Sequence, residues 1–123
     1  PTLFAPIATI AAFRHGEEWR KQMLAYIEEN IRFVEDYCKE NIPGIRPLRP
    51  QASFLVWLNC RDLNLSHDEL LDLFIDKAHL ALNDGEMFGP GGEGFMRLNV
   101  AAPRSVLQQA LQQLAEAVKA RQQ

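Results

Sequence analysis

The clearest alternation of apolar and polar residues runs from Phe95 to Val100, near the end of the chain. Successive side chains of a strand point to opposite faces, so this pattern predicts a strand with one core face. The core face holds Met96, Leu98 and Val100. The opposite face carries Phe95, Arg97 and Asn99, with a permanent cation at its centre.

Two helices are predicted at the start of the chain. Residues 17–40 repeat apolar side chains at helical spacing and predict one long helix of about 36 Å, at about 1.5 Å per residue. Residues 1–13 are almost uncharged and predict a shorter helix that runs to Gly16 and is apolar on all sides, which is typical of a buried helix. The stripe of the long helix is Trp19, Met23, Tyr26, Ile27, Ile31, Val34, Tyr37 and Cys38.

The remaining pattern alternates short strands and helices. Residues 45–48 predict a short strand, and residues 53–59 predict a central strand that is apolar on both faces and therefore covered on both. Ser66 and Glu69 form a capping-box sequence that opens a helix to about residue 78. Residues 80–83 predict another short strand, and Pro103 fits the first position of a final helix. Its stripe is Val106, Leu107, Ala110, Leu111, Leu114, Ala117 and Val118. This order predicts an α+β fold, a small sheet with helices packed against it.

Composition narrows the class of protein. The 123 residues are 47% hydrophobic with a net charge of −3, which fits one domain with a real core. We find no basic stripe, which argues against nucleic-acid and anionic-membrane partners. No apolar run approaches the roughly 20 residues of a membrane helix. Cys38 and Cys60 are too few for a disulfide framework, lack a metal-ligand spacing, and suit a reducing cytoplasm.

The strongest candidate site is the glycine-dense run that feeds the last strand. Five of the seven glycines lie between positions 85 and 94, so the backbone there can approach something closely. Arg97 follows, and its planar fork of donors suits a carboxylate or a phosphate. The ordinary alternative is that Arg97 forms a structural ion pair with Glu86 or Glu93. Both interpretations stay open on the residue pattern.

Two nucleotide motifs are rejected in the same run. Gly89, Gly91 and Gly94 match G-x-G-x-x-G, but that fingerprint needs a strand before the glycines and a helix after them. Here a strand follows the glycines instead, and Pro90 fills the first variable position. A phosphate loop ending in Gly-Lys-Ser/Thr is also missing from the sequence.

The chain offers no convincing catalyst, cofactor ligand or metal ligand. The three histidines read as surface or capping residues, and the two cysteines read as small core residues. The acids of the third helix occupy a solvated face, and the lysines lie on polar helix faces, unlike a Schiff-base lysine. These side chains are His15, His67 and His79; Asp68, Glu69, Asp72 and Asp76; and Lys21, Lys39, Lys77 and Lys119.

Four stretches together resemble a known family. They are Ala8–Phe13 with Gly16–Trp19, Ala52–Leu63 with Trp57, Asn83–Gly89, and Gly94–Asn99 with Ala102–Arg104. Over essentially the whole chain, the sequence resembles the C-terminal portion of class I and II aminotransferases, pyridoxal-phosphate enzymes of fold type I. It is most similar to their branch of cystathionine β-lyase-type carbon–sulfur lyases. Ser53-Phe54 and Asn59 depart from that branch, which usually has Thr-Tyr and Asp.

The resemblance implies a domain plan and a role for one residue. Residues 1–16 would be a helix left from a large domain, residues 17–40 the connecting helix, and residues 41–123 the small C-terminal domain. Arg97 would bind the α-carboxylate of a small L-amino acid, the sole site residue that we assign. The cofactor lysine and the pyridoxal-phosphate site would lie upstream in a missing N-terminal large domain.

The parent enzyme would be a cytoplasmic homodimer that performs carbon–sulfur β-elimination or transamination, with pyridoxal phosphate as electron sink. The chain alone would be inactive and would bind no cofactor. A second hypothesis keeps the chain as a stand-alone α+β module that binds a small carboxylate through Arg97. The apolar first helix favours a piece of a longer protein, because a complete module would not expose it.

Overall fold

The predicted α+β class is confirmed by the computed structural model, which describes residues 2–121. Residue 1 of the range 1–16 and residues 122–123 of the range 41–123 lie outside the described residues. A four-stranded antiparallel sheet has the order β1-β2-β4-β3 and consists of β1 (Arg46–Leu48), β2 (Leu55–Asn59), β3 (Asn83–Asp84) and β4 (Phe95–Asn99). The longer helices are α1 (Phe4–His15), α2 (Glu17–Asn41) and α4 (Arg104–Arg121).

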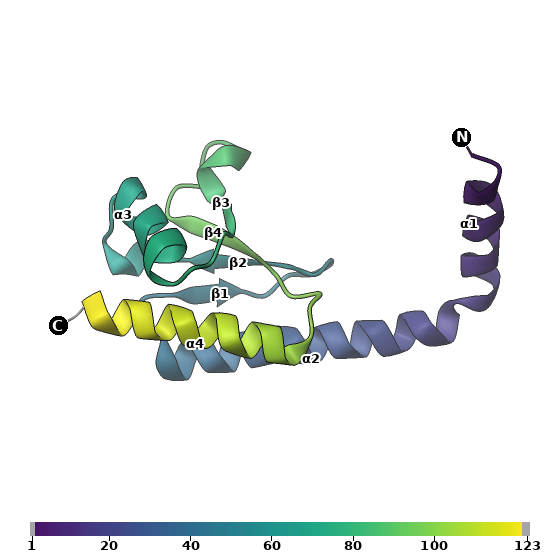
Figure 1. The fold of residues 1–123 in the computed structure, drawn as a ribbon, viewed down its shortest axis with the longest axis horizontal. Helices are drawn as coiled ribbons and strands as arrows, with labels where there is room; N and C mark the ends of the chain where they lie inside the picture. The colour runs from purple at the N-terminus through teal and green to yellow at the C-terminus, as the bar shows by residue number, and fades with distance from the viewer. Residues whose placement is uncertain (1, 122–123) are drawn as a thin grey trace.

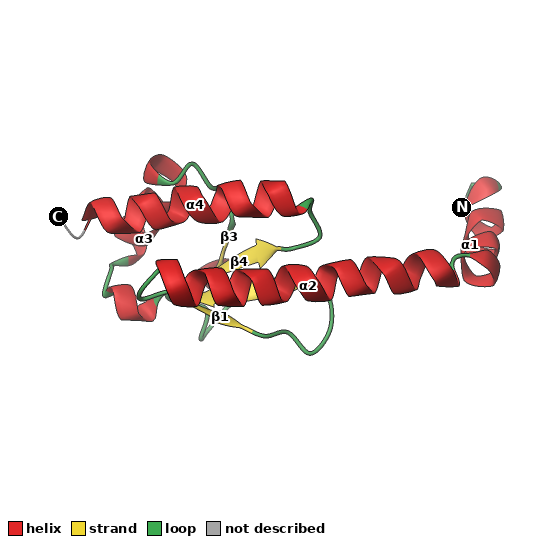
Figure 2. Ribbon diagram, turned by 90° about the horizontal axis from the view of Figure 1, so that it is seen from below, coloured by secondary structure: helices red, strands yellow, loops and turns green. Residues whose placement is uncertain are grey.

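The molecule has two layers, the sheet and a pair of helices. Helices α2 and α4 run side by side beneath one face of the sheet (Figures 1 and 2). That inner face carries the fully buried Val56 and Leu58 of β2 and Met96 of β4. Leu98 and Val100 are also buried, so the alternation that predicted β4 and its core face is confirmed. The outer face, with Trp57 and Arg97, is half-buried.

Helix α2 extends well beyond the sheet (Figure 1). Its middle and C-terminal turns supply Ile27, Ile31, Val34 and Cys38 to the core, as predicted. The predicted core position of Trp19 is wrong, because this side chain is 68% exposed on the overhanging half. No helix within residues 2–121 is both long enough and apolar enough to cross a membrane.

Helix α1 forms where the sequence predicts it but buries nothing. It lies at the free end of α2, turned away from the rest of the fold (Figure 1), and none of its residues is buried. Phe4 is 78% exposed and Phe13 is 87% exposed. An all-round apolar helix is expected in an interior, so this surface has no partner among the described residues.

Two strand predictions need correction. Strand β2 begins at Leu55 rather than residue 53, because Ser53 has φ = +73°, a left-handed conformation that a strand cannot contain. Its faces also differ, since Val56 and Leu58 are buried and Trp57 is only half-buried. The prediction that both faces are covered is therefore wrong. Strand β3 occupies residues 83–84 rather than 80–83, because the N–H of Leu80 bonds to the preceding helical turn instead, at Phe74 O (2.7 Å).

The capping box is confirmed, but the helix that it opens is short. The hydroxyl of Ser66 accepts from the Glu69 N–H at 3.3 Å, and the Glu69 carboxylate accepts from the Ser66 N–H at 2.8 Å. Helix α3 (His67–Asp72) then gives way to a π-helical turn, Leu73–Lys77, in which the Ala78 N–H reaches Leu73 O. The extra residue in this turn was not visible in the helical spacing.

The final helix begins one residue later than predicted. Pro103 precedes α4, and its carbonyl accepts from Val106 and Leu107 at the start of the helix. Leu107, Leu111 and Leu114 are buried as predicted. Val106 is 53% exposed and is not a core residue.

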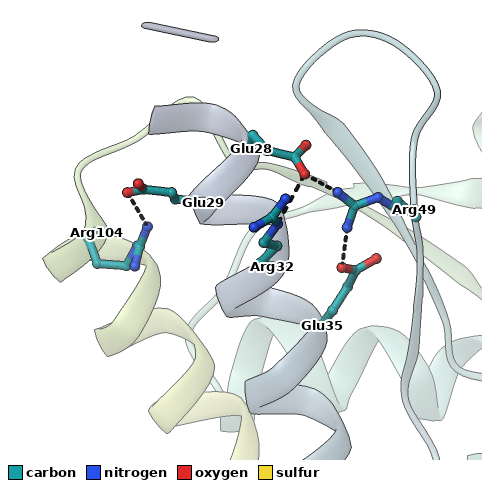
Figure 3. A network of polar contacts seen from close by, with 6 residues as sticks. All are labelled: Glu28, Glu29, Arg32, Glu35, Arg49 and Arg104. Atoms are coloured by element: carbon teal, nitrogen blue, oxygen red, sulfur yellow. Dashed lines mark hydrogen bonds and ion pairs between the residues drawn. The ribbon is translucent and has the colours of Figure 1, made fainter. Parts of the chain in front are cut away.

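Polar contacts fasten the overhanging helix to the loop after β1. Arg49 reaches two carboxylates of α2, Glu28 and Glu35, the second at 2.6 Å (Figure 3). Glu28 also pairs with Arg32 one turn further along. Because these side chains are partly exposed, each pair adds at most about 1 kcal/mol. These contacts therefore orient the loop and add little to the free energy of unfolding.

Candidate functional site

The candidate arginine stands at the centre of a row that crosses the whole sheet. In the strand register, Arg97 of β4 lies opposite Trp57 of β2 on one side and Asn83 of β3 on the other. Trp57 in turn lies opposite Leu48 of β1. Directly opposed residues in antiparallel strands project to the same face. The row therefore places an apolar side and an amide side around one cation.

Arg97 is held by one residue of β3 and one residue of the turn that follows β3. Its Nη2 donates to Asn83 Oδ1 at 3.0 Å. Its guanidinium carbon lies 4.3 Å from the centre of the Phe88 ring, a cation–π distance. The Nε atom is enclosed and has no hydrogen-bond partner in the described chain.

A structural ion pair does not account for this arginine. Within residues 2–121 no carboxylate lies within 4.0 Å of the Arg97 guanidinium. Glu86, one of the two acids considered as a partner, lies 3.1 Å from the ring of His67 instead. Arg97 thus keeps its charge and most of its donors, which is what recognition of a carboxylate or phosphate requires.

The glycine run does make a close backbone approach, but both of the segments that approach each other belong to this run. A Cβ added at Gly85 would lie 2.2 Å from Gly92 O, and one at Gly92 would lie 2.0 Å from Gly85 O. Any side chain at either position would separate these two backbone segments. The glycines therefore close the loop on itself, and the anion cradle that they were expected to form is not built by them.

A second arginine locks this loop from outside. Arg61 donates from Nε to Glu93 O at 3.0 Å and from Nη2 to Gly91 O at 3.1 Å. Its guanidinium also lies over the Phe95 ring, 4.7 Å from the centre. Arg61 is therefore engaged by the loop, whereas Arg97 on the same face remains available.

His67 joins α3 to the turn that carries Phe88. Its Nε2 lies 3.3 Å from Asp84 Oδ2, and its Nδ1 lies 3.1 Å from Glu86 Oε1. The second distance fits an ion pair but its angles do not fit a hydrogen bond, since Nδ1 has no hydrogen-bond partner. The sequence had shown His67 only as a cap residue.

The other candidate reactive groups are not arranged for chemistry. Burial raises the pKa of the Cys38 and Cys60 thiols to about 12, with a smaller effect of Cys38 on Cys60, so both stay protonated and unreactive. All four lysines are exposed on helix surfaces. Across the part of the chain that the structure describes, no three His, Cys, Asp or Glu side chains gather closely enough to hold a metal ion.

Comparison with known proteins shows which enzymes this chain is similar to. No profile of a known protein family matches the chain. Cystathionine β-lyase PatB of Bacillus subtilis is 36% identical over 115 residues, which is 94% of this chain and 30% of the relative. A pyridoxal-phosphate-bound structure from Clostridium difficile 630, described as an aminotransferase, superposes with a TM-score of 0.91 at 38% identity, over 95% of this chain and 30% of that one.

Cystalysin from Treponema denticola, whose structure contains pyridoxal 5′-phosphate, gives a TM-score of 0.84 at 33% identity, over 89% of this chain and 28% of that one. The chain matches a C-terminal domain of the class I and II aminotransferase family. This confirms the resemblance read from the sequence. The chain spans about 30% of the length of the curated relatives that it matches first.

The aminotransferase cofactor does not fit a site built by this chain alone. A pyridoxal-phosphate lysine must be enclosed and desolvated to react as a neutral amine. Lys21, Lys39, Lys77 and Lys119 are all exposed. The described residues instead supply one available arginine on an aromatic face. The described residues therefore offer a cation that can hold a carboxylate, and no lysine in a setting that would hold the cofactor.

Proposed function

We propose that this chain is the substrate-binding C-terminal domain of a pyridoxal-phosphate-dependent enzyme that acts on a small L-amino acid. Arg97 would bind the α-carboxylate of that substrate. The observation that supports this role is the state of Arg97, which faces no carboxylate and makes one side-chain hydrogen bond among residues 2–121. Relatives that include a cystathionine β-lyase and a pyridoxal-phosphate-bound aminotransferase-like protein support the substrate class.

In this role Arg97 positions the substrate and performs no bond-breaking step. A guanidinium holds a carboxylate through two parallel N–H···O bonds, which fix its rotation as well as its location. Fixing the carboxylate decides which bond of the α-carbon faces the catalytic groups. The same anchor serves β-elimination and transamination, so both reactions remain part of the proposal.

The catalytic lysine and the cofactor would be supplied by another part of a longer protein. The four exposed lysines of this chain support that division of labour. We therefore propose that the chain is inactive alone. The homodimer and the cytoplasmic location that the resemblance implies remain predictions of the same proposal.

The exposed first helix fits the proposed domain plan. Residues 1–16 would belong to a large domain, residues 17–40 would connect the two domains, and residues 41–123 would form the small domain. Helix α1 and the exposed Trp19 of α2 form an apolar surface with no cover in the described chain. Such a surface is typical of one side of an interdomain contact. It also disfavours the stand-alone module, which would leave the same surface in water.

The decisive experiment replaces Arg97 by lysine in the full-length enzyme. Lysine keeps the charge but loses the two parallel donors, so we expect KM to rise and kcat/KM to fall. One misplaced charge-assisted pair costs roughly 2–4 kcal/mol, about 30-fold or more in kcat/KM. The melting temperature and the cofactor absorbance should stay unchanged. Arg32→Lys, at an exposed position of α2, is the matched control.

The opposite pattern would assign Arg97 a structural role. In that case the variant would lose thermal stability and keep its kcat/KM. Unchanged kcat/KM would remove Arg97 from the site whatever the stability shows.

A further inference from the structure

We propose that Asn83 and Phe88 are positioning residues that hold the Arg97 guanidinium in one plane and one direction for its ligand. This inference rests on the proposed function of Arg97. A long arginine side chain loses rotamer entropy when a ligand must order it. A guanidinium that is already fixed binds without that cost.

Asn83 fixes the direction of the cation without neutralising it. Its Oδ1 accepts from Arg97 Nη2 at 3.0 Å, while its Nδ2 faces the Met87 sulfur at 4.0 Å. A thioether sulfur accepts hydrogen bonds but cannot donate them. Met87 therefore favours the amide rotamer that presents oxygen to Arg97. An amide oxygen is neutral, so the full positive charge remains for the ligand.

Phe88 fixes the plane of the cation. Its ring lies 4.3 Å from the guanidinium carbon of Arg97. The ring is itself held edge-on by Trp57 at 5.4 Å and 90°, and Trp57 meets Phe95 at 6.3 Å and 89°. A ring over one guanidinium face blocks ligands from that side. The guanidinium plane stays open to a carboxylate, and approach in that plane gives the geometry of a two-bond pair.

The backbone that carries both residues is rigid for its length. Asn83 lies in β3, and Phe88 ends the 3₁₀ turn Gly85–Phe88 that follows directly. The Asp84 carboxylate caps this turn by accepting from the Glu86 N–H at 3.1 Å. The contact of Gly85 with the opposite limb of the loop fixes the turn against β4.

The remaining donors define where the ligand binds. The Nε of Arg97 is enclosed, and Asn83 takes one hydrogen of Nη2. Within residues 2–121, Nη1 donates to no side chain or backbone group. A carboxylate therefore meets the terminal nitrogens end-on. Replacing the Asn83 amide by a carboxylate would place a competing anion against the same nitrogens.

The test compares two ligands that differ only in the carboxylate. In the full-length enzyme, inhibition constants are measured for L-alanine and for L-alaninamide, which keeps the amine and the methyl group. Asn83→Asp is expected to weaken the binding of L-alanine by at least about tenfold, because the new carboxylate repels the carboxylate of the ligand. Phe88→Leu should weaken the binding of L-alanine about two- to fivefold, because the cation–π contact is lost. L-Alaninamide should change less than about twofold in both variants, since it does not use the charge of Arg97.

Three further variants make the result specific. Phe88→Tyr keeps the ring and should bind L-alanine nearly normally. Asn83→Ala removes the hydrogen bond without adding charge, and should weaken L-alanine less than Asn83→Asp does. Gln109→Glu makes the same amide-to-carboxylate change at an exposed position of α4 and should leave both constants unchanged.

The outcomes separate this inference from the proposed function. If Arg97→Lys leaves L-alanine binding unchanged, the proposed function of Arg97 fails. If Arg97→Lys weakens L-alanine while Asn83→Asp, Asn83→Ala and Phe88→Leu do not, the proposed function stands and the positioning role is overturned. Equal weakening of both ligands would also overturn it, because that pattern indicates general damage to the site.

Discussion

Asn30 accepts a hydrogen bond of 2.7 Å from the Nε of Arg104, although the two residues are 74 positions apart. The amide nitrogen of the same Asn30 donates to Val100 O at 2.8 Å and to Ala102 O at 2.9 Å. One buried side chain thus ties α2 to the segment between β4 and α4. Arg104 also pairs with Glu29 at 4.0 Å (Figure 3). The strand that carries Arg97 is fixed to the long helix through this junction.

Asn30→Ala should therefore be among the most destabilising single changes in the chain. It leaves one buried carbonyl, one partly buried carbonyl and one guanidinium nitrogen without their partner, and we expect a loss of about 3 kcal/mol in the free energy of unfolding. Urea denaturation of the isolated chain measures this. Asn41→Ala removes an exposed amide that bonds only to Tyr37 O and should cost less than about 0.5 kcal/mol. A similar small loss for Asn30→Ala would contradict the structural role.

The capping box should give the fold a defined sensitivity to acid. The backbone N–H of Ser66, then Arg121 and the Ser66 hydroxyl, lower the pKa of Glu69 below its usual value. A lowered carboxyl pKa stabilises the fold above the unfolded-state value, and that contribution disappears as the pH falls through the folded-state value. Glu69→Gln should therefore be less stable than the wild type at pH 7 and nearly equal to it at the acid end of the transition. A constant difference across the acid range would argue against this link.

The two thiols should be inert and should make the fold sensitive to alkali. Burial raises the pKa of Cys38 and Cys60 from 9.0 to about 12. Between these values the unfolded chain releases thiol protons that the folded chain keeps, so stability falls as the pH rises. Cys60→Ala should show a shallower decline between pH 9 and 11. At pH 8, iodoacetamide should label the native thiols at least about a hundredfold more slowly than in urea; equal rates would show that the thiols are accessible.

The exposed α1 surface should drive self-association of the isolated chain. Leu3, Phe4, Ile7, Ile10 and Phe13 are each at least half exposed. Phe4→Ser combined with Phe13→Ser should reduce association in sedimentation velocity and change the free energy of unfolding by less than about 0.5 kcal/mol. A monomeric wild-type chain whose α1 amides resist hydrogen exchange would show that the proposed domain boundary at residue 16 is misplaced.

The isolated chain should not attach pyridoxal phosphate through a lysine with unit stoichiometry. Each lysine is exposed, so none has the enclosed setting of a lysine that holds the cofactor. Borohydride reduction after incubation with the cofactor, followed by peptide mass spectrometry, measures any attachment. Full modification of one of the four lysines would overturn the division of labour proposed for this chain.

Much of the fold could be predicted because local patterns carry it. Neighbouring residues decide three of the predicted features: the alternation in β4, the stripe of α2 from Ile27 to Cys38, and the capping box at Ser66. The π-turn at Leu73–Lys77 packs against α4, and β3 is paired with β4 over Asn83 and Asp84. Spacing along the chain does not record such contacts.

The surroundings of Arg97 could not be predicted for the same reason. Arg97 stood out because a lone cation on a strand is conspicuous. Asn83 reads as a turn residue, and Phe88 reads as part of a glycine loop, so the sequence does not show that they meet Arg97. Asn30 could have been noticed in the sequence, because it is a polar residue inside the apolar stripe of α2. A polar side chain is buried only with hydrogen-bond partners.

The row of residues across the sheet also controls how the molecule can misfold. If β4 slipped by one residue against β2, Arg97 would turn inward between Val56 and Leu58, and Met96 would turn outward. Burying an unpaired guanidinium costs several kcal/mol, comparable to the whole stability of a domain this size. Off-register chains are therefore eliminated before they persist. The register that buries Met96 is also the register that leaves Arg97 on the outer face. Correct pairing of the strands therefore places the candidate arginine at the same time.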